Sequence, residues 1–346
     1  MLMFIIYYSF HVQNIPGCHL QAMNNKNTKG FMHGTKSPIQ FFLAIKWYSL
    51  NLGMIKSKQF FAWVFFAVVS LNAFAQENTT SFFEDFNNDS LQNFRYGSTG
   101  TKSGFKWKSG VVSVTDKNTK VLALRIDPAD SAGAGRGPEI ISNKQTHFGT
   151  YSSRIKIPDV KKIQPNTGAV VGYFTYQMDT IAGLSEIDFE WLVADPTIIY
   201  IGTWTGQRGK LIRVGRTINL AKGIIYSTAY REGYHGTNIL LSGIQNQPEK
   251  ISALDSYDAS AEFYTYGFDW SADRITWWII NPRDKGKIIL WDYQGSALGI
   301  PQNASRYRMN FWYTSDWAVE TNPASVEKPT QPYELDVDWM SYEAKK

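Results

Sequence analysis

The sequence predicts an all-β protein, an antiparallel two-sheet β-sandwich or jelly roll. Short runs rich in β-branched and aromatic residues follow one another along most of the chain, and turn residues such as Asp127-Pro128 and Lys285-Gly286 separate them. Long amphipathic helical patterns are scarce, and no break in composition marks a second folded domain. With 346 residues, of which 43% are hydrophobic and 15% aromatic, the chain can build a large core.

Each expected strand is a short apolar run bounded by turn residues. The weakly patterned stretch 232–260 is instead expected to be surface loop with some strand, and is a candidate insertion at the rim of the sandwich. In chain order the expected strands cover residues 111–114, 121–126, 151–157, 170–176, 186–192, 198–205, 264–269, 275–280, 287–293, 308–313 and 335–342.

The formal net charge of +5 comes from the N-terminal segment rather than from the expected domain. Residues 1–75 contain six lysines and no acidic residue. The chain has 35 lysines and arginines and 30 acidic residues. When these six lysines are left out, the basic residues number one fewer than the acidic ones. A nearly neutral domain gives no electrostatic basis for binding nucleic acid.

The same segment has the features of a secretory signal peptide at residues 54–75. Lys56 and Lys58 form a short basic region, residues 60–71 are largely apolar, and Ala73-Phe74-Ala75 is a small-residue cleavage site. The apolar run is shorter than the roughly 20 residues of a membrane-spanning helix, which favours cleavage over an uncleaved anchor. We therefore expect export, to a secreted or periplasmic location, with no membrane association after cleavage.

The expected mature chain, residues 76–346, forms one domain. Residues 1–53 precede the signal peptide and show no sustained periodicity, so we expect them to be a misassigned or removed extension. Cys18 lies in that extension, so the mature chain has neither a disulfide nor a thiol nucleophile. His147 and His235 lack metal-ligand spacing and are interpreted as ordinary polar residues.

The most informative segment is a short acidic strand. Successive side chains of a strand point to opposite faces, so Glu186, Asp188 and Glu190 share one face while Ile187 and Phe189 take the other. Same-face neighbours are about 6.5 to 7 Å apart, and three like charges at that spacing reduce stability unless they serve a purpose. Acid/base chemistry is such a purpose; the alternative is a solvent-facing acidic stripe on an edge strand.

This Glu-x-Asp-x-Glu strand resembles the catalytic strand of glycoside hydrolase family 16. The single residue between Asp188 and Glu190 is similar to lichenases and xyloglucan-active members, and differs from laminarinases and agarases. The resemblance spans nearly all of residues 81–343 and implies a concanavalin-like jelly roll with a concave substrate cleft. Other blocks similar to the family, in the same order, are residues 146–158, 170–176, 257–270 and 309–312, followed by Trp317.

The resemblance implies a retaining mechanism for the acidic strand. Glu186 would be the nucleophile, Glu190 the acid and later the base, and Asp188 would orient Glu186 and control the proton distribution. Retention needs the two glutamate carboxyl groups about 5 to 5.5 Å apart, closer than the roughly 13 Å between their backbone positions, so the side chains must lean together. Mutual repulsion is expected to keep Glu190 protonated while Glu186 stays ionised.

The resemblance also implies substrate contacts, since sugar rings stack their C–H faces on aromatic side chains. It places Trp204, Trp312 and Asn310 in the cleft, with core packing as the alternative for Trp204. Glu139 is a further cleft candidate, with a surface role as its alternative. Lichenases commonly carry an arginine two residues after a cleft glutamate, whereas this chain has Ile141, so we expect that guanidinium to be missing and mixed-linkage specificity stays open.

An ion site is implied by one further match. Asp338 falls on a strand where family members often carry a calcium ligand. Calcium needs six to eight oxygen ligands, so an ordinary strand-end acid is the alternative for Asp338. No organic cofactor is implied, and a structural calcium would be remote from the chemistry.

The function implied by the resemblance is an endo-acting hydrolase of internal β-linkages in a polysaccharide, expected to be a β-glucan, working as a monomer. A xyloglucan- or galactan-active enzyme, or a transglycosylase that passes the covalent sugar to another glycan, would use the same three acids. A non-catalytic carbohydrate-binding sandwich is an alternative from another class. The complete set of acids argues against it, because binding alone does not need three crowded carboxylates.

Overall fold

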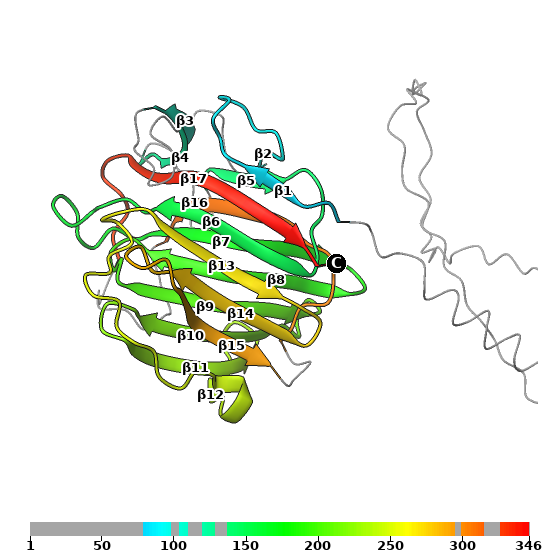
Figure 1. Ribbon diagram of the computed structural model, residues 1–346. Coiled ribbons are helices and arrows are strands. Elements are labelled where there is room, and N and C mark those ends of the chain that lie inside the picture. Colours follow the sequence, from blue (N-terminus) through cyan, green and yellow to red (C-terminus); the bar gives the residue numbers. More distant parts are fainter. Residues whose placement is uncertain are drawn as a thin grey trace, which may run out of the picture. The chain divides into compact units, whose positions relative to one another are not determined.

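Two antiparallel β-sheets face each other in the computed structural model (Figure 1). The structure describes residues 79–97, 104–109, 120–128, 137–294, 299–314 and 326–345, all within the unit Leu71–Lys346. The expected signal peptide at 54–75, the expected strand at 111–114 and Trp317 lie outside the described residues. Among the described residues, no helix is long and apolar enough to cross a bilayer.

The first sheet has eight strands, in the order β15-β14-β13-β6-β17-β4-β3, with β1 paired to β17. Every pairing is antiparallel, as expected for a sandwich in which consecutive strands are joined by turns. Its strands are β1 (Phe82–Glu84), β3 (Phe105–Lys108), β4 (Val121–Ile126), β6 (Gly149–Lys156), β13 (Tyr264–Trp270), β14 (Arg274–Ile280), β15 (Lys287–Gln294) and β17 (Tyr333–Ala344).

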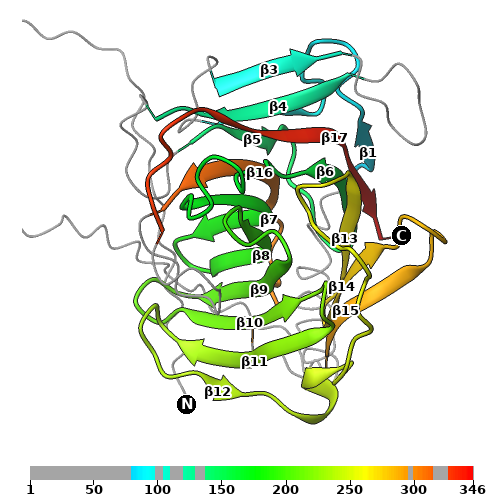
Figure 2. The ribbon, with the colours of Figure 1, turned by 90° about the vertical axis from the view of Figure 1, so that its left-hand side faces the viewer.

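The second sheet has nine strands, in the order β12-β11-β10-β9-β8-β7-β16-β5-β2. The acidic strand β8 is therefore its central strand, with four strands on either side, and Figure 2 shows β7 to β11 running side by side. Its strands are β2 (Phe94–Tyr96), β5 (Glu139–Ser142), β7 (Ala169–Asp179), β8 (Gly183–Leu192), β9 (Ile198–Gly206), β10 (Ile212–Asn219), β11 (Ile224–Glu232), β12 (Ile239–Leu240) and β16 (Arg306–Tyr313).

The core between the sheets is built from aromatic side chains of both. On β8, Phe189 and Trp191 are fully buried, and their stacked rings lie 5.6 Å apart between centroids. From the opposite sheet, Trp277 of β14 donates a 3.1 Å hydrogen bond from its indole nitrogen to the backbone carbonyl of Asp188. Each such ring removes on the order of 150 to 250 Å² from water, so the core face of β8 is held firmly while its other face stays open.

The all-β class is confirmed, and the expected strands that fall on described residues are present. The sequence analysis missed the hairpin of β10 and β11, because Arg213, Gly215 and Arg216 interrupt the apolar pattern. Arg216 faces the core side and is fully buried; its guanidinium donates to Thr228 Oγ1 and to the carbonyls of Pro248 and Leu290. A satisfied buried arginine is possible in a strand, but it removes the apolar signature that identifies one.

The stretch 232–260 is a loop with little regular structure, as expected. After Glu232, the last residue of β11, its regular elements are the two-residue edge strand β12 and a short 3₁₀ helix, Gly243–Asn246. Together with β11 it forms the edge of the nine-stranded sheet.

Candidate active site

The three acids of β8 lie on the face of the nine-stranded sheet that points away from the core. Ile187 and Phe189 are fully buried in the core, whereas Glu186 and Glu190 are partly exposed on the other face. Asp188 shares that face but is only 5% exposed, because the two glutamates flank it. The alternation that the sequence predicts is confirmed, and the edge-strand alternative is wrong because β8 is central.

The strands beside β8 set the surroundings of each acid through their register. Glu186 lies opposite Tyr176 of β7 and Trp204 of β9, so an aromatic side chain stands on each side of it. Cross-strand partners share one face of a sheet, so these two rings border the acidic row. Trp204, which the sequence analysis predicted to lie in the cleft, is thus next to Glu186.

Glycines next to the other two acids let neighbouring groups lie close to the acidic row. Gly172 lies opposite Glu190, and Gly202 lies opposite Asp188. A Cβ atom on Gly172 would lie 2.4 Å from Oδ1 of Asn310, and one on Gly202 would lie 2.5 Å from the carbonyl oxygen of Val214. A side chain at either position would therefore displace its surroundings and fill space beside the acids.

A cavity of about 370 Å³ opens beside Glu186 on the β7, β16 and β5 side. It brings together Glu186 and three residues that the sequence analysis placed in the cleft, although they come from separate parts of the chain. Glu139 and Asn310 lie opposite each other across the β5 and β16 pair. The cavity is lined by Gly137, Glu139, Phe174, Tyr176, Glu186, Arg308, Asn310 and Trp312.

Position 141 holds isoleucine rather than arginine, but a guanidinium from another strand lies beside Glu139. Arg308 of β16 lies directly opposite Ile141, and its Nη1 donates a 3.1 Å hydrogen bond to Oε1 of Glu139. The guanidinium also lies over the ring of Tyr176, 4.9 Å from the ring centre, which is within the roughly 6 Å of a cation–π interaction. The neighbouring strand thus supplies the charge that the sequence of β5 lacks.

Burial raises the pKa of all three acids, and repulsion by neighbouring carboxylates raises it further for Glu186 and Asp188. Desolvation and the charge of Glu190 raise the pKa of Glu186 to about 8, against the lowering effect of Arg308. Desolvation raises the pKa of Glu190 to about 7, against Arg213, and the pKa of Asp188 is raised by burial and by both glutamates. The row therefore holds fewer than three negative charges at neutral pH.

These surroundings do not single out Glu190 as the protonated glutamate. The expected pattern was an ionised Glu186 beside a protonated Glu190, yet the pKa of Glu186 is raised at least as far. The physical reason is that both glutamates lose hydration and each has one arginine nearby. The charged and titratable groups facing the row come from five other strands of the sheet: Glu139, Tyr176, Tyr200, Arg213 and Arg308.

On the β9 and β10 side, Arg213 and Tyr200 form a rigid pair next to the row. The Nε of Arg213 donates a 2.8 Å hydrogen bond to the hydroxyl oxygen of Tyr200, and its guanidinium lies 4.4 Å from the centre of that ring. Tyr200 is only 3% exposed and lies opposite Glu190. Sequence reasoning missed Arg213 and Arg308, because a lone arginine on a strand carries no motif and only the strand pairing brings it to the acids.

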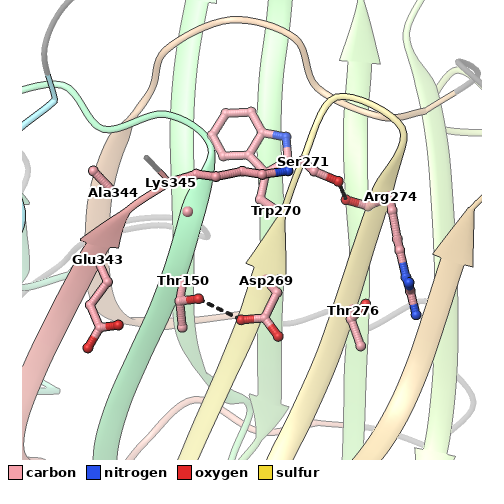
Figure 3. Close-up of a pocket in the computed structure, with 10 residues that line it drawn as sticks. Thr150, Asp269, Trp270, Ser271, Arg274, Thr276, Glu343, Ala344 and Lys345 are labelled. Atoms are coloured by element: carbon pink, nitrogen blue, oxygen red, sulfur yellow. Dashed lines mark hydrogen bonds between the residues drawn. The ribbon is translucent and has the colours of Figure 1, made fainter.

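A second hollow, of about 510 Å³, lies on the eight-stranded sheet and holds none of the acids of β8 (Figure 3). Thr150 donates a 2.7 Å hydrogen bond to Asp269 there, and Arg274 and Thr276 stand on the next strand. The one tryptophan of its lining, Trp270, is 2% exposed and offers no platform to a sugar. This hollow therefore offers neither the row of three acids nor an exposed tryptophan.

The residues around Asp338 do not fit a calcium ion. The carboxylate of Asp338 forms a buried ion pair with Nη1 of Arg154. Over the residues that the structure describes, no group of three histidine, cysteine or acidic side chains could hold a metal. A guanidinium already neutralises this carboxylate, whereas calcium requires several oxygen ligands together.

A row of carboxylates on one open sheet face, bordered by aromatic rings and a cavity, defines a class of protein: an all-β glycoside hydrolase. The family follows from comparison. The chain belongs to the glycosyl hydrolases family 16, whose model matches residues 100–222 and 225–341. Polysaccharides are the substrates that membership of this family implies.

Curated relatives are distant. The beta-glucanase of Bacillus amyloliquefaciens is 25% identical over 273 residues, which cover 77% of this chain and 88% of that protein. The beta-glucanase of Paenibacillus polymyxa is 23% identical over 300 residues, which cover 84% of this chain and 99% of that protein. Among solved structures, a lichenase from a mouse hindgut metagenome aligns over 77% of this chain and 100% of its own, with 19% identity and a TM-score of 0.48.

Proposed function

We propose that this protein is an endo-acting, retaining β-glucanase that cleaves internal bonds of a polysaccharide by double displacement. The single observation that carries the proposal is the position of Glu186, Asp188 and Glu190 on one open face of the central strand β8. Four strands extend on either side of β8, so a polysaccharide chain can cross the acids in both directions. The curated relatives named beta-glucanases support a glucan as the substrate.

In the first step, the carboxylate of Glu186 attacks the anomeric carbon while the carboxyl of Glu190 gives its proton to the departing glycosidic oxygen. The bond from carbon to that oxygen breaks, and an ester joins the sugar to Glu186. In the second step, Glu190 takes a proton from water as the water oxygen attacks the same carbon. The ester bond breaks, which frees Glu186 as a carboxylate and restores the proton on Glu190.

The raised pKa values of the acids support the protonation state that this mechanism needs. The starting state requires one proton among the two glutamates, and burial with repulsion favours such a state near neutral pH. Asp188 lies between them and is buried, so its own protonation changes the charge that each glutamate experiences. When Glu190 gives up its proton in the first step, esterification of Glu186 removes one charge from the row.

The substrate can be tested by incubating residues 76–346 with barley β-glucan, laminarin, xyloglucan and agarose while reducing ends are measured. We expect rapid release from barley β-glucan with a range of product lengths, as endo cleavage produces. Preference for xyloglucan or agarose would replace the assigned substrate: the protein would then be a xyloglucan- or galactan-active enzyme that uses the same three acids. Longer mixed chains without new reducing ends would indicate transfer to another glycan.

Binding without product from any of these polysaccharides would instead favour a carbohydrate-binding module. The matched control is Glu186→Gln, which keeps the shape of the side chain but cannot form the ester. If the wild-type protein and Glu186→Gln released the same amount of reducing ends, the catalytic assignment would be wrong.

We also propose that the protein is exported with cleavage after Ala75. The signal features at residues 54–75 support this proposal. Mass spectrometry of the exported protein should give Gln76 as its N-terminal residue. Recovery of residues 1–53 in the exported protein would contradict it.

A further inference from the structure

The cavity beside Glu186 covers only one side of the acidic row. Its lining residues come from β5, β7, β8 and β16 and the segment just before β5, whereas β9 to β12 lie on the other side of β8. An enzyme that cuts inside a chain must hold sugar rings on both sides of the broken bond. The side of β9 to β12 therefore needs a sugar-binding surface of its own.

An exposed tyrosine stands at that place. Tyr234 follows β11 and is 62% exposed, yet its ring centre lies only 4.9 Å from that of Trp204, with 36° between the ring planes. Trp204 in turn lies opposite Glu186 on the neighbouring strand. The two rings thus form a continuous aromatic surface that leads from the acid row toward the edge of the sheet.

The turn that carries Tyr234 is held in place by two glycines. Gly233 has a φ of +69°, which disfavours other residues, and its amide donates a 2.7 Å hydrogen bond to the carbonyl oxygen of Leu211. A Cβ atom on Gly236 would lie 2.0 Å from the carbonyl oxygen of Glu232, so the turn closes only with glycine there. A fixed turn holds the tyrosine ring against Trp204 before any ligand arrives, which reduces the entropy lost on binding.

Supported aromatic rings with an exposed face are what the C–H faces of a sugar pack against. We propose that Tyr234, supported by Trp204, is a second sugar platform that binds a ring of the polysaccharide on the β9 to β11 side of the acids. The inference rests on the proposed function, because it assigns part of the same cleft. It makes the turn after β11 a determinant of how many sugars the enzyme holds.

The test compares Tyr234→Ala with Tyr226→Ala. Tyr226 is an exposed tyrosine, 40% accessible, on β11 where the register with β10 shifts, and it lines neither the cavity beside Glu186 nor the small hollow around Arg213. Kinetics are measured on the polysaccharide that the wild-type protein cleaves and on a series of shorter oligosaccharides. We expect Tyr234→Ala to raise KM on the polysaccharide about three- to tenfold, with a smaller effect on shorter chains.

Two further variants distinguish the effect of the aromatic ring of Tyr234 from the effect of the turn that holds it. Tyr234→Phe keeps the aromatic face and should restore a KM close to that of the wild-type protein, while Gly236→Ala keeps the ring but displaces the turn and should raise KM. Equal KM values for Tyr234→Ala and Tyr226→Ala on the polysaccharide would overturn the proposal. A loss of the same size on every chain length would also overturn it, because that pattern means that Tyr234 only positions Trp204.

Affinity electrophoresis in gels that contain the same polysaccharides distinguishes this proposal from the proposed function. If the wild-type protein is retarded but releases no product, the hydrolase assignment fails; the platform is then supported if Tyr234→Ala reduces the retardation and overturned if it does not. Neither retardation nor product from any polysaccharide would overturn both.

Discussion

Arg308 and Glu139 form an ion pair in the wall of the cavity beside Glu186, with 3.1 Å between Nη1 and Oε1. Neither side chain is fully exposed, and the pair places one positive and one negative charge near Glu186. A partly buried pair interacts more strongly than a surface pair because water screens it less. The charge state of Glu186 therefore depends on residues of two other strands.

Replacing Arg308 with glutamine should move the acid side of the pH profile to higher pH. Arg308 lowers the pKa of Glu186, so its removal raises that pKa, and the nucleophile stays protonated over a wider acid range. We expect kcat/KM to fall about three- to tenfold on the acid side and less at alkaline pH. A pH profile of kcat/KM measures the change, and Arg308→Lys should recover part of it.

Glu139→Gln should produce a shift of the opposite sign. Without the Glu139 carboxylate, the charge of Arg308 is no longer neutralised and acts more fully on Glu186. The acid limb should then move to lower pH. Shifts in the same direction for Arg308→Gln and Glu139→Gln would show that the pair acts through packing rather than charge.

Azide should reveal which glutamate forms the ester. In Glu186→Ala, azide can occupy the vacated space and attack the anomeric carbon of an activated aryl glycoside, which gives a glycosyl azide of inverted configuration. In Glu190→Ala, the ester on Glu186 still forms and azide then attacks it, which gives retained configuration. NMR of the products distinguishes the two, and without azide we expect kcat on a polysaccharide to fall at least about a thousandfold in both variants.

Exchanged configurations would reverse the assigned roles of Glu186 and Glu190. The raised pKa values of both glutamates do not by themselves distinguish the two roles. Retained configuration from both variants would contradict a nucleophile role for either glutamate of β8.

The acidic row should reduce stability at alkaline pH. The pKa of Glu186 is raised to about 8 in the folded protein by burial and by Glu190, so folding favours its protonated form. The contribution of Glu186 to the free energy of unfolding is greatest below the ordinary pKa near 4.5 and falls as the pH rises toward 8. Glu186→Gln removes this ionisation and should stabilise the protein by about 1 to 3 kcal/mol at pH 8 and little at pH 4.5, as measured by urea unfolding.

Glu334→Gln is a control of opposite sign. Burial raises the pKa of Glu334, but the ion pairs with Lys106 and Lys108 outweigh it and lower the pKa overall. Its stabilising effect is present above the ordinary pKa and is lost as the pH falls, so this variant should be less stable than the wild type at pH 8. If both variants were destabilised at pH 8, the raised pKa of Glu186 would not be a source of instability.

The buried pair of Arg154 and Asp338 should matter for folding rather than for metal binding. Asp338→Asn leaves the guanidinium without its counter-charge and should reduce the free energy of unfolding by about 3 to 5 kcal/mol. Replacing both residues with apolar ones should recover most of that loss. Added calcium or EDTA should leave the melting temperature unchanged; a rise of several degrees with calcium would contradict this account.

The strands were predictable where side chains alternate or form apolar runs. The β8 strand is the strongest example, because Ile187 and Phe189 pack in the core and the acids between them do not. The hairpin of β10 and β11 was not predictable, since the burial of Arg216 depends on carbonyl acceptors from the segment after β12 and from β15. Backbone groups that are distant in the chain accept the hydrogen bonds of this buried charge, so the local sequence carries no pattern that predicts its burial.

The catalytic candidates were predictable from one segment, whereas their environment was not. The sequence by itself determined which side chains of β8 share a face, because strand alternation is a local property of the backbone. Only the tertiary structure decided that Arg308 meets Glu139, that Tyr234 meets Trp204 and that Asp338 meets Arg154. These pairs join residues far apart in the chain, and strand pairing together with loop closure, rather than local propensity, fixes the distances between them.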